Sequence, residues 1–558
     1  MKTKKVLALL LAATTLASFT ACGKSGDSNN SQKDSSDKSS KESTVDSKEE
    51  KLDYTYGIDK TFKSDEPIKY SMMYSDHENY PYKEDWLFWS KLTEMTNVSF
   101  ELKMIPRADY DDKKSLLING GESSYIIPKT YDESAFVTGG AVVAVSDWVE
   151  YMPNYMKFVE DYKLEDDLKI ITKEDGKYYR LPGMWAEPKS EYTWVIRKDI
   201  FDAAGVDITA LEKNYTCDTF SEALEKVAKA NPGKTVWSDR WKGEAGLKVI
   251  GDSYDVPAGW AKNDGMSYDA EKDEFYFAEV TDDCKNMCKM LNNLVENGII
   301  DKETFTQEDS AAEEKFYNGK SFMIGSNESM LGTYASKMNE TLGEGKFELY
   351  SIVPPAAEGK ENYLSENSRL ENGIMISTKA LEELGKDGFI KMLRFVDWLW
   401  YSPEGHTFVK WGVEGETYTV ENGTKTLKPE IGYGAINPDA TKKLNVDYGF
   451  SNGVFMYGGT TENRTSMLSD ALKDYYTRIN SIKKIRPLKP AVAFSEEDTE
   501  QMNLIKSPLM DYVNTSVLQF ITGQSDIDEN WDTFVQKCKS NNYEKYVTMY
   551  NDTYKSSK

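Results

Sequence analysis

Short apolar runs and helical repeats alternate along the first part of the chain. Three runs have the length and composition of strands, at residues 67–74, 97–106 and 123–128. Between the first two, Trp86, Trp89 and Leu92 recur at helical spacing. A second helix is expected from Asp109 up to Gly120. This alternation predicts an α/β lobe with a largely parallel sheet.

Ligands of such sheets bind at the carboxyl ends of the strands. The loops at residues 74–82 and 129–133 follow predicted strands. We therefore expect both loops to face a ligand.

Two extended stretches rich in proline and glycine predict connections between two lobes. The first, residues 175–197, leads into a helix at Asp199, and the second spans residues 347–377 around a Pro-Pro pair. Two crossings that lie far apart in sequence require lobes built from discontinuous segments. The expected boundaries are 53–187 with 356–410 for lobe 1 and 188–355 with 411–558, including a C-terminal helical region, for lobe 2. A chain of 558 residues is also too long for one hydrophobic core.

The N-terminus has the layout of an export signal. Three lysines precede an apolar run that starts at Val6 and ends in small residues before Cys22. This resembles the lipobox of bacterial lipoproteins, although Phe19 stands where that motif usually has leucine; an ordinary secretory signal is the alternative. We expect residues 1–21 to be a signal peptide and Cys22 to carry a lipid. Residues 22–52 are polar, with basic and acidic side chains interleaved, which predicts a disordered tether.

Composition narrows the classes of partner. The net charge of −25 argues against binding to nucleic acid, whose phosphates require a basic surface. The chain contains 35 Tyr, 12 Trp and 22 Phe residues. Tryptophan and tyrosine in loops suit ligands that have both apolar faces and hydroxyl groups, such as sugars.

Cysteine and histidine give no sign of a cofactor or metal. Cys284 and Cys288 lie one helical turn apart, so both should face the core, with a disulfide as the alternative. A zinc site would need further ligands, and the chain has two histidines. No cofactor and no metal are expected.

Several motifs resemble the extracellular solute-binding proteins that serve ABC importers, in their large carbohydrate-associated branch. They are DGKYYRLPG followed by TWVIRKDIFDAAG, then LVENGIIDKETF with KFYNGKSFMIGSNESM, and VDWLWYSPEGHTFVKWGVEGETY at residues 396–418. The last segment can also be explained by a structural role. Phe389, Leu393, Val396 and Trp400 share one helix face, which predicts that this motif specifies fold.

The resemblance implies a two-lobed, type II α/β clamp with a hinge and no catalytic activity. It implies a lipid-anchored protein on the outer face of the bacterial cell membrane, a monomer that captures an oligosaccharide and delivers it to ABC permease subunits. The alternatives are a binding protein for peptides or other polar solutes and, less well supported, a secreted glycoside hydrolase. A hydrolase would need a pair of carboxylates about 5–10 Å apart.

Candidate ligand contacts are aromatic and polar side chains in predicted loops rather than in helical stripes. They are Tyr74, Trp185, Trp237, Arg240, Trp241, Trp260, Asn327, Glu328, Glu366, Asn367 and Arg369. The helical Trp86, Trp89, Trp398 and Trp400 are instead expected in the core.

Overall fold

We describe a computed structural model of the chain. It describes residues 52–190, 192–262, 264–328, 330–364, 368–434, 436–556 and 558. The expected signal peptide, the lipid site at Cys22 and the tether lie outside these residues, as do Glu366 and Asn367. Contacts between residues separate Met1–Lys51 from Leu52–Lys558, and only the second unit is described below.

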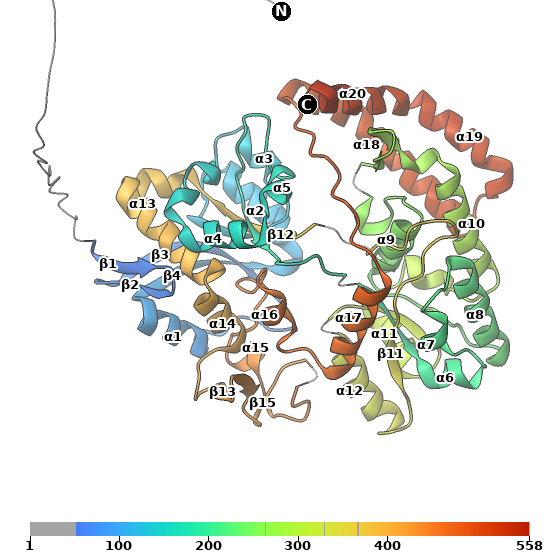
Figure 1. The fold of residues 1–558 in the computed structure, drawn as a ribbon, viewed down its shortest axis with the longest axis horizontal. Helices are drawn as coiled ribbons and strands as arrows, with labels where there is room; N and C mark the ends of the chain where they lie inside the picture. The colour runs from blue at the N-terminus through green and yellow to red at the C-terminus, as the bar shows by residue number, and fades with distance from the viewer. Residues whose placement is uncertain are drawn as a thin grey trace, which may run out of the picture. The chain divides into compact units, whose positions relative to one another are not determined.

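Lobe 1 is built around a five-stranded sheet with the strand order β4-β3-β5-β12-β6 (Figure 1). β3 is parallel to β4 and β5, whereas β12 is antiparallel to both of its neighbours, β5 and β6. The strands are β3 (Ile68–Asp76), β4 (Val98–Pro106), β5 (Ile126–Thr130), β6 (Leu181–Met184) and β12 (Leu370–Ile376). The strands β3, β4 and β5 lie where the hydrophobic pattern predicts them. The parallel part of the sheet is therefore confirmed.

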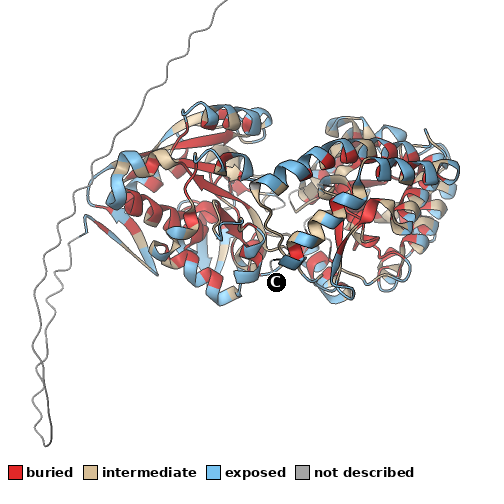
Figure 2. Ribbon diagram, turned by 90° about the horizontal axis from the view of Figure 1, so that it is seen from above, coloured by how far each residue is buried: buried red, intermediate tan, exposed pale blue. Residues whose placement is uncertain are grey.

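Hydrophobic clusters cover both faces of this sheet. Consecutive side chains of a strand point to opposite faces, so each strand contributes to both clusters. Met72 and Ile126 pack into one hydrophobic cluster, and their neighbours Met73 and Ile127 pack into another on the opposite face. The helices α1 and α13 contribute to the first cluster, and α2 and α3 to the second. Figure 2 shows the strands of both lobes as largely buried.

The other elements of lobe 1 are β1 (Tyr54–Gly57), β2 (Lys60–Ser64), α1 (Leu87–Thr96), α2 (Tyr110–Asn119), α3 (Ser134–Val137), α4 (Pro153–Tyr162), α5 (Glu165–Lys169), α13 (Thr378–Tyr401), α14 (Pro403–Trp411), β13 (Tyr418–Glu421), β14 (Thr424–Leu427), β15 (Ile431–Gly432), β16 (Lys442–Lys443), α15 (Leu444–Asp447) and α16 (Thr461–Thr465).

Lobe 2 contains a three-stranded antiparallel sheet in the order β10-β7-β11. The C-terminal helices α18 and α19 pack against α10. The elements of this lobe are β7 (Thr193–Arg197), α6 (Lys198–Ala203), α7 (Ile208–Leu211), α8 (Cys217–Ala230), α9 (Glu244–Ser253), β8 (Met266–Asp269), β9 (Glu274–Phe277), α10 (Asp282–Glu296), α11 (Asp309–Tyr317), β10 (Met323–Ser326), α12 (Met330–Leu342), β11 (Leu349–Ser351), α17 (Asp470–Ile482), α18 (Glu496–Ile521), α19 (Ile527–Ser540) and α20 (Tyr543–Ser556).

The cores place two segments differently from the expected boundaries. Ala357 packs into the main core of lobe 2 and Leu364 packs with α17, so the second crossing to lobe 1 comes after residue 364. The buried residues from Trp411 to Met467 belong to the core of lobe 1 rather than that of lobe 2. We therefore take lobe 1 as 52–187 with 368–467 and lobe 2 as 188–364 with 468–558. The physical reason is that these side chains fill the lobe 1 core beside α1 and α13.

The motif at residues 396–418 is a core element, as predicted. Phe389, Leu393, Val396 and Trp400 of α13 are each at most 1% exposed. Trp86 and Trp398 are equally buried, and Trp89 is half-buried against the same cluster. The predicted core positions of these tryptophans are confirmed.

The buried cysteines follow the predicted helical face. Cys284 and Cys288 lie on α10 together with Met287 and Leu291, and all four are buried. Neither cysteine forms a disulfide.

Among the helices that the structure describes, none combines the length and the apolar character needed to span a bilayer.

His406 in α14 makes stability depend on pH. Burial lowers its pKa to about 4, while its Nε2 lies 2.6 Å from the carbonyl oxygen of Trp400. The unfolded chain therefore takes up a proton near pH 6.5 that the folded chain takes up only near pH 4. We expect the free energy of unfolding to fall by about 2–3 kcal/mol from this group between pH 7 and 4.5.

Urea unfolding of the parent and His406→Gln at both pH values measures this contribution. The difference between the two proteins should shrink by that amount as the pH falls. His77→Gln is the control, because His77 is only half-buried whereas His406 is buried. An unchanged difference between the parent and His406→Gln would show that His406 does not sense pH.

Candidate functional site

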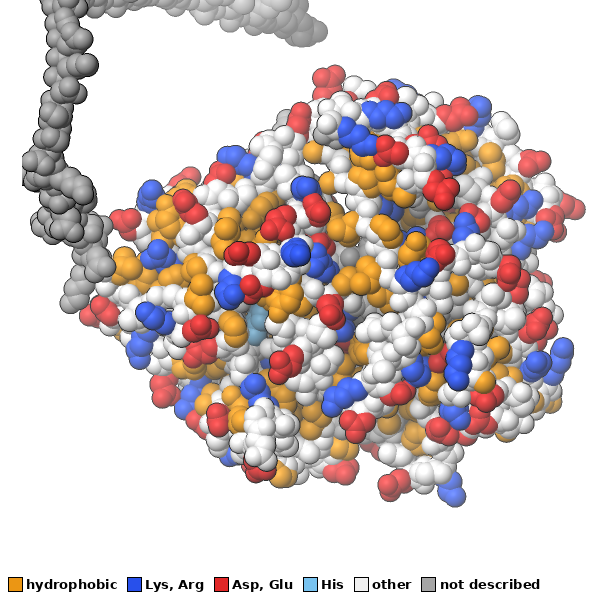
Figure 3. All heavy atoms as spheres, viewed as in Figure 1, with side chains coloured by type: hydrophobic (Ala, Val, Ile, Leu, Met, Phe, Trp, Pro, Cys, Tyr) orange, Lys and Arg blue, Asp and Glu red, His pale blue; other side chains and the backbone are white. Residues whose placement is uncertain are grey.

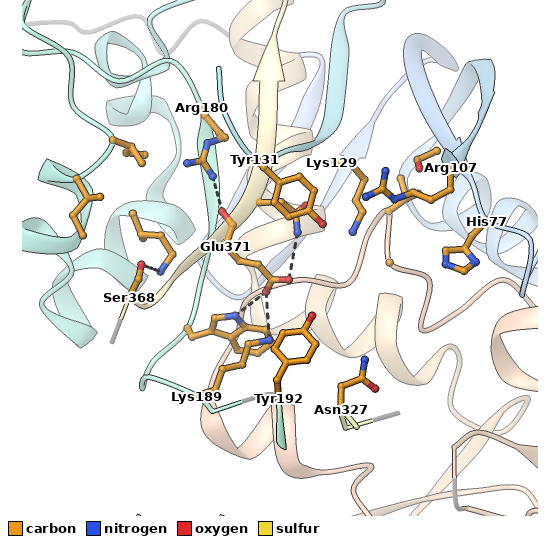
Figure 4. A pocket seen from close by; sticks show the side chains of 18 of the residues that line it. His77, Arg107, Lys129, Tyr131, Arg180, Lys189, Tyr192, Asn327, Ser368 and Glu371 are labelled. Atoms are coloured by element: carbon orange, nitrogen blue, oxygen red, sulfur yellow. Dashed lines mark hydrogen bonds and ion pairs between the residues drawn. The ribbon is translucent and has the colours of Figure 1, made fainter. Parts of the chain in front are cut away.

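A cavity of about 690 Å³ lies where both lobes contribute side chains (Figure 4). Lobe 1 supplies most of its wall, from the carboxyl ends of β3, β4 and β5, from β12, and from Arg180 and Trp185 at the two ends of β6. Lobe 2 supplies Lys189, Tyr192 and Asn327. The loops at 74–82 and 129–133, which were expected to face a ligand, contribute His77, Tyr80, Lys129 and Tyr131 to this wall.

The ends of the three parallel strands bring basic groups together. His77 follows β3, Arg107 follows β4 and Lys129 lies near the end of β5. Figure 4 shows the three side chains on the same side of the cavity. Burial lowers the pKa of His77, and the charges of Arg107 and Lys129 lower it further, against Glu78, which raises it. His77 is therefore a neutral side chain at pH 7, and its ring stacks on Tyr80 at 4.5 Å between centroids.

A β-bulge sets the direction of Lys129. Gly373 of β12 pairs with Thr130, and Met375 pairs with Ile127, so β5 has one extra residue in this interval. Lys129 adopts φ = 54°, the left-handed conformation that side chains rarely take. This conformation costs roughly 1–2 kcal/mol in a residue other than glycine. Bulges next to binding sites commonly redirect a side chain, and this one directs Lys129 to the cavity wall.

On the opposite side, an aromatic ring is held by charged neighbours. The indole Nε1 of Trp185 donates to Oε2 of Glu371 at 2.7 Å, and Nζ of Lys189 lies 4.5 Å from the centre of the same ring. Lys189 is also 3.8 Å from Oε2 of Glu371. The guanidinium of Arg180 donates to the carbonyl oxygen of Glu371 at 2.6 Å. These bonds fix Trp185 and Glu371 on one wall.

Lobe 2 adds a second aromatic group. Tyr192 lines the cavity and packs edge-on against Trp241 and Trp260, at 5.7 and 5.1 Å between centroids. Trp241 and Trp260 therefore support Tyr192 from behind. Trp260 is 41% exposed.

Of the residues predicted from sequence, Trp185 and Asn327 line the cavity. Tyr74 does not: it is 1% exposed, and its hydroxyl accepts a hydrogen bond from Nδ2 of Asn452 at 2.7 Å within the core. Trp237 is also buried, because its indole donates to Oδ2 of Asp239 at 2.9 Å. Asp239 accepts from the indole of Trp194 as well, at 3.3 Å, so this loop folds inward around a buried carboxylate.

Three charged candidates are engaged elsewhere. Arg240 forms ion pairs with Asp309 at 3.1 Å and Glu313 at 3.0 Å. Glu328 accepts hydrogen bonds from Arg464 at 3.0 Å and from the hydroxyl of Tyr476, and so joins lobe 2 to α16 of lobe 1. Arg369 pairs with the fully buried Asp167 at 2.6 Å. None of the three lines the described cavity wall.

Sequence reasoning did not single out most of the basic wall or its partner carboxylate. The residues concerned are Arg107, Arg180, Lys189 and Glu371, and the aromatic Tyr192 was missed as well; His77 and Lys129 lie in the two loops that were expected to face a ligand. A usable signal existed, since Arg107 follows the predicted strand that ends at Pro106. A charged residue that follows a strand is usually only exposed to solvent, so nothing in the sequence favoured Arg107 as a ligand contact.

The cavity has the chemistry of a binding site. Both aromatic side chains and hydrogen-bonding groups line it, which suits a polar ligand with apolar faces. Glu371 is the one carboxylate among its described lining residues. The carboxylate pair of a glycosidase is therefore not assembled by these residues. In the described part of the chain, no group of three or more His, Cys, Asp or Glu side chains could hold a metal ion.

Two discontinuous α/β lobes that share a cavity define the fold of extracellular solute-binding proteins. The predicted fold class and the resemblance to this class are confirmed by comparison with known proteins. The chain is 22% identical over 499 residues to the fructooligosaccharide ABC transporter substrate-binding protein FusA of Streptococcus pneumoniae, covering 81% of this chain and 84% of that protein. No family model matches the sequence.

Solved structures agree on the fold. The alginate-binding protein AlgQ2 superposes with a TM-score of 0.66 at 17% identity, covering 88% of this chain and 99% of that one. FusA of S. pneumoniae in complex with kestose gives a TM-score of 0.61 at 16% identity, with 88% and 100% covered. A solute-binding protein from Bifidobacterium longum subsp. infantis gives 0.65 at 15% identity, with 88% and 98% covered.

Proposed function

We propose that this protein is the substrate-binding component of an ABC importer, which captures an oligosaccharide between its lobes and delivers it to a permease. The observation that carries the proposal is the cavity at which both lobes meet, with Trp185 and Tyr192 among polar groups. Aromatic faces pack on the C–H faces of sugar rings, and the polar groups bind the hydroxyls. Relatives that bind oligosaccharides support this assignment.

In this role, ligand binding favours closure of the two lobes, because a ligand that contacts both stabilises the closed population. The protein acts outside the cell as a monomer, held to the membrane by a lipid on Cys22, and releases its cargo to the transmembrane subunits. It binds without turnover.

A glycan panel tests the proposal. Thermal unfolding of the protein is measured with neutral and charged oligosaccharides and with peptide pools, and the solutions are analysed for products after several hours. We expect at least one oligosaccharide to raise the unfolding temperature without being cleaved. Stabilisation by peptides alone would replace the sugar assignment by a peptide-binding one, and cleavage products would support a hydrolase.

Replacement of Cys22 tests the anchor. In Cys22→Ala no thiol remains to accept a diacylglycerol, so most of the protein should move from the membrane fraction to the soluble fraction. Fractionation of cells followed by immunoblotting measures this distribution. Cys217→Ala is the control, because Cys217 is buried in the folded body. If Cys22→Ala stays with the membrane as the parent does, Cys22 is not the anchor.

A further inference from the structure

Positive charge in the cavity exceeds the negative charge that faces it. The described lining contains Arg107, Lys129, Arg180 and Lys189 but one carboxylate, Glu371. This imbalance contrasts with the protein as a whole, whose net charge is −25. On the face shown in Figure 3, acidic and basic side chains are interspersed, so grouped basic side chains are not the general pattern there.

Two of the four cations are compensated by nearby carboxylates. The Nε of Arg180 donates to Oε2 of Glu133 at 2.9 Å, and Glu133 is 2% exposed. Lys189 lies 3.8 Å from Glu371. Arg180, Lys189 and Glu371 form part of the cavity wall, whereas Glu133 is not among its described lining residues. The excess of positive charge in the cavity therefore comes from Arg107 and Lys129.

The compensation of Arg107 is weak and shared. Its nearest carboxylate is that of Asp111, at 3.5 Å. Asp111 is mostly exposed and makes a shorter ion pair, 2.8 Å, with Lys114. One solvated carboxylate therefore serves two cations, and its shorter bond goes to the one outside the cavity.

Lys129 has no carboxylate within ion-pair distance among the residues that the structure describes. Its ammonium lies 6.0 Å from the ring of Tyr131. The side chain is half-buried, and the bulge in β5 holds it at the cavity wall in a left-handed backbone conformation. Figure 4 shows Lys129 and Arg107 on the same side of the cavity, and the charges of both act on His77. Two cations on one wall repel each other, and an anion bound by both removes that repulsion.

We propose that the ligand is an anionic oligosaccharide, with a carboxylate or sulfate group of one sugar bound by Arg107 and Lys129. This inference rests on the proposed function and names its substrate class. Trp185 and Tyr192 bind the ring faces, and the two cations bind the oxyanion. Arginine binds carboxylate and sulfate oxygens through a planar pair of donors, and lysine acts as a point charge. The electrostatic field of distant charges is screened beyond about 8–10 Å at physiological salt. The two local cations therefore determine which charge of ligand the cavity favours, despite the negative net charge of the protein.

Calorimetric titration with two pairs of related sugars, one charged and one neutral in each pair, tests the proposal. The probes are an oligogalacturonate, its neutral methyl ester, and a sulfated and an unsulfated galactan oligosaccharide. We expect at least one charged probe to bind about tenfold or more tightly than its neutral counterpart, since hydrogen bonds to charged groups are the stronger ones. The two charged probes distinguish a carboxylate ligand from a sulfate ligand.

Variants then assign the effect to the two cations. Lys129→Gln and Arg107→Gln should each weaken binding of the charged probe about tenfold or more, and change binding of the neutral probe less than twofold. Lys129→Asn is a second variant at the bulge, because asparagine adopts the left-handed conformation more readily. Lys157→Gln is the matched control: Lys157 is exposed on α4 of the same lobe and pairs with Asp161 at 2.8 Å. Unfolding curves without ligand establish that each variant is folded.

The results separate this inference from the proposed function. If a neutral oligosaccharide binds as tightly as any charged probe and the variants at Arg107 and Lys129 do not weaken binding, the ligand is a neutral sugar and only this inference is overturned. If no glycan of either kind binds, the proposed function itself is wrong. If the charged probe binds and Lys157→Gln weakens it as much as Lys129→Gln does, the attraction is general and the assigned site is wrong.

Discussion

Alanine in place of Trp185 should weaken oligosaccharide binding by about ten- to a hundredfold. The indole lies on the cavity wall, and its Nε1 donates to Glu371 at 2.7 Å. Truncation removes the apolar face on which a sugar ring would pack. It also leaves Glu371 without the donor that orients it and Lys189 without the ring beneath it. The loss therefore combines reduced contact area with a less ordered site.

Calorimetry with the best glycan of the panel measures this loss, and Trp185→Phe separates its two parts. Phenylalanine keeps an aromatic face but has no N–H donor, so the loss should be smaller than for alanine. Trp148→Ala is the control, because Trp148 packs against Phe389 of α13 and is not among the described lining residues. Unchanged affinity in Trp185→Ala, with an unchanged unfolding curve, would mean that the ligand binds elsewhere.

The second large effect is expected for stability rather than for binding. Trp398→Ala should lower the free energy of unfolding by about 3–5 kcal/mol. Trp398 is fully buried on α13, and its Nε1 donates to Oε2 of Glu404 at 2.7 Å. Its ring lies among those of Phe395 and Phe408. Truncation opens a cavity in the core of lobe 1 and breaks this hydrogen bond.

Urea unfolding at pH 7 measures the change in Trp398→Ala. The exposed Trp260 offers a matched comparison, since Trp260→Ala should cost about 1 kcal/mol or less. Glycan affinity of folded Trp398→Ala should stay within twofold of the parent, because Trp398 does not line the cavity. A loss of stability below about 1 kcal/mol would contradict a core role for the motif at residues 396–418.

The sequence predicted those features whose cause is local. The strands at the start of lobe 1 and the buried face of α10 follow from the spacing of apolar residues, which is a property of neighbours along the chain. The same holds for Trp400, which shares a helix face with Leu393 and Val396, while Trp398 was expected in the core because it lies on the same helix. Loop composition indicated Trp185, and the rule for the carboxyl ends of strands indicated the loop that holds Lys129; both line the cavity.

Tertiary packing overruled composition for other loop residues. Trp237 lies in a loop rich in polar residues, yet its indole turns inward to the buried carboxylate of Asp239. Tyr74 belongs to a strand end but faces the core. The segment from Trp411 to Met467 joined lobe 1 because its side chains fill space beside α1 and α13, and no local signal specifies the partner of a packed surface.

The sequence alone was enough to recognise two lobes, the connections between them and the class of protein. Hydrophobic periodicity and motifs are properties of residues that lie close together along the chain. The tertiary structure decided which charges meet. A helix lies between Arg107 and Lys129 in sequence, and the two residues converge because β4 and β5 flank β3 and run parallel to it. The bulge that directs Lys129 to the cavity depends on pairing with β12, more than two hundred residues later in the chain. Strand order and register are set by packing, and they determine the binding site.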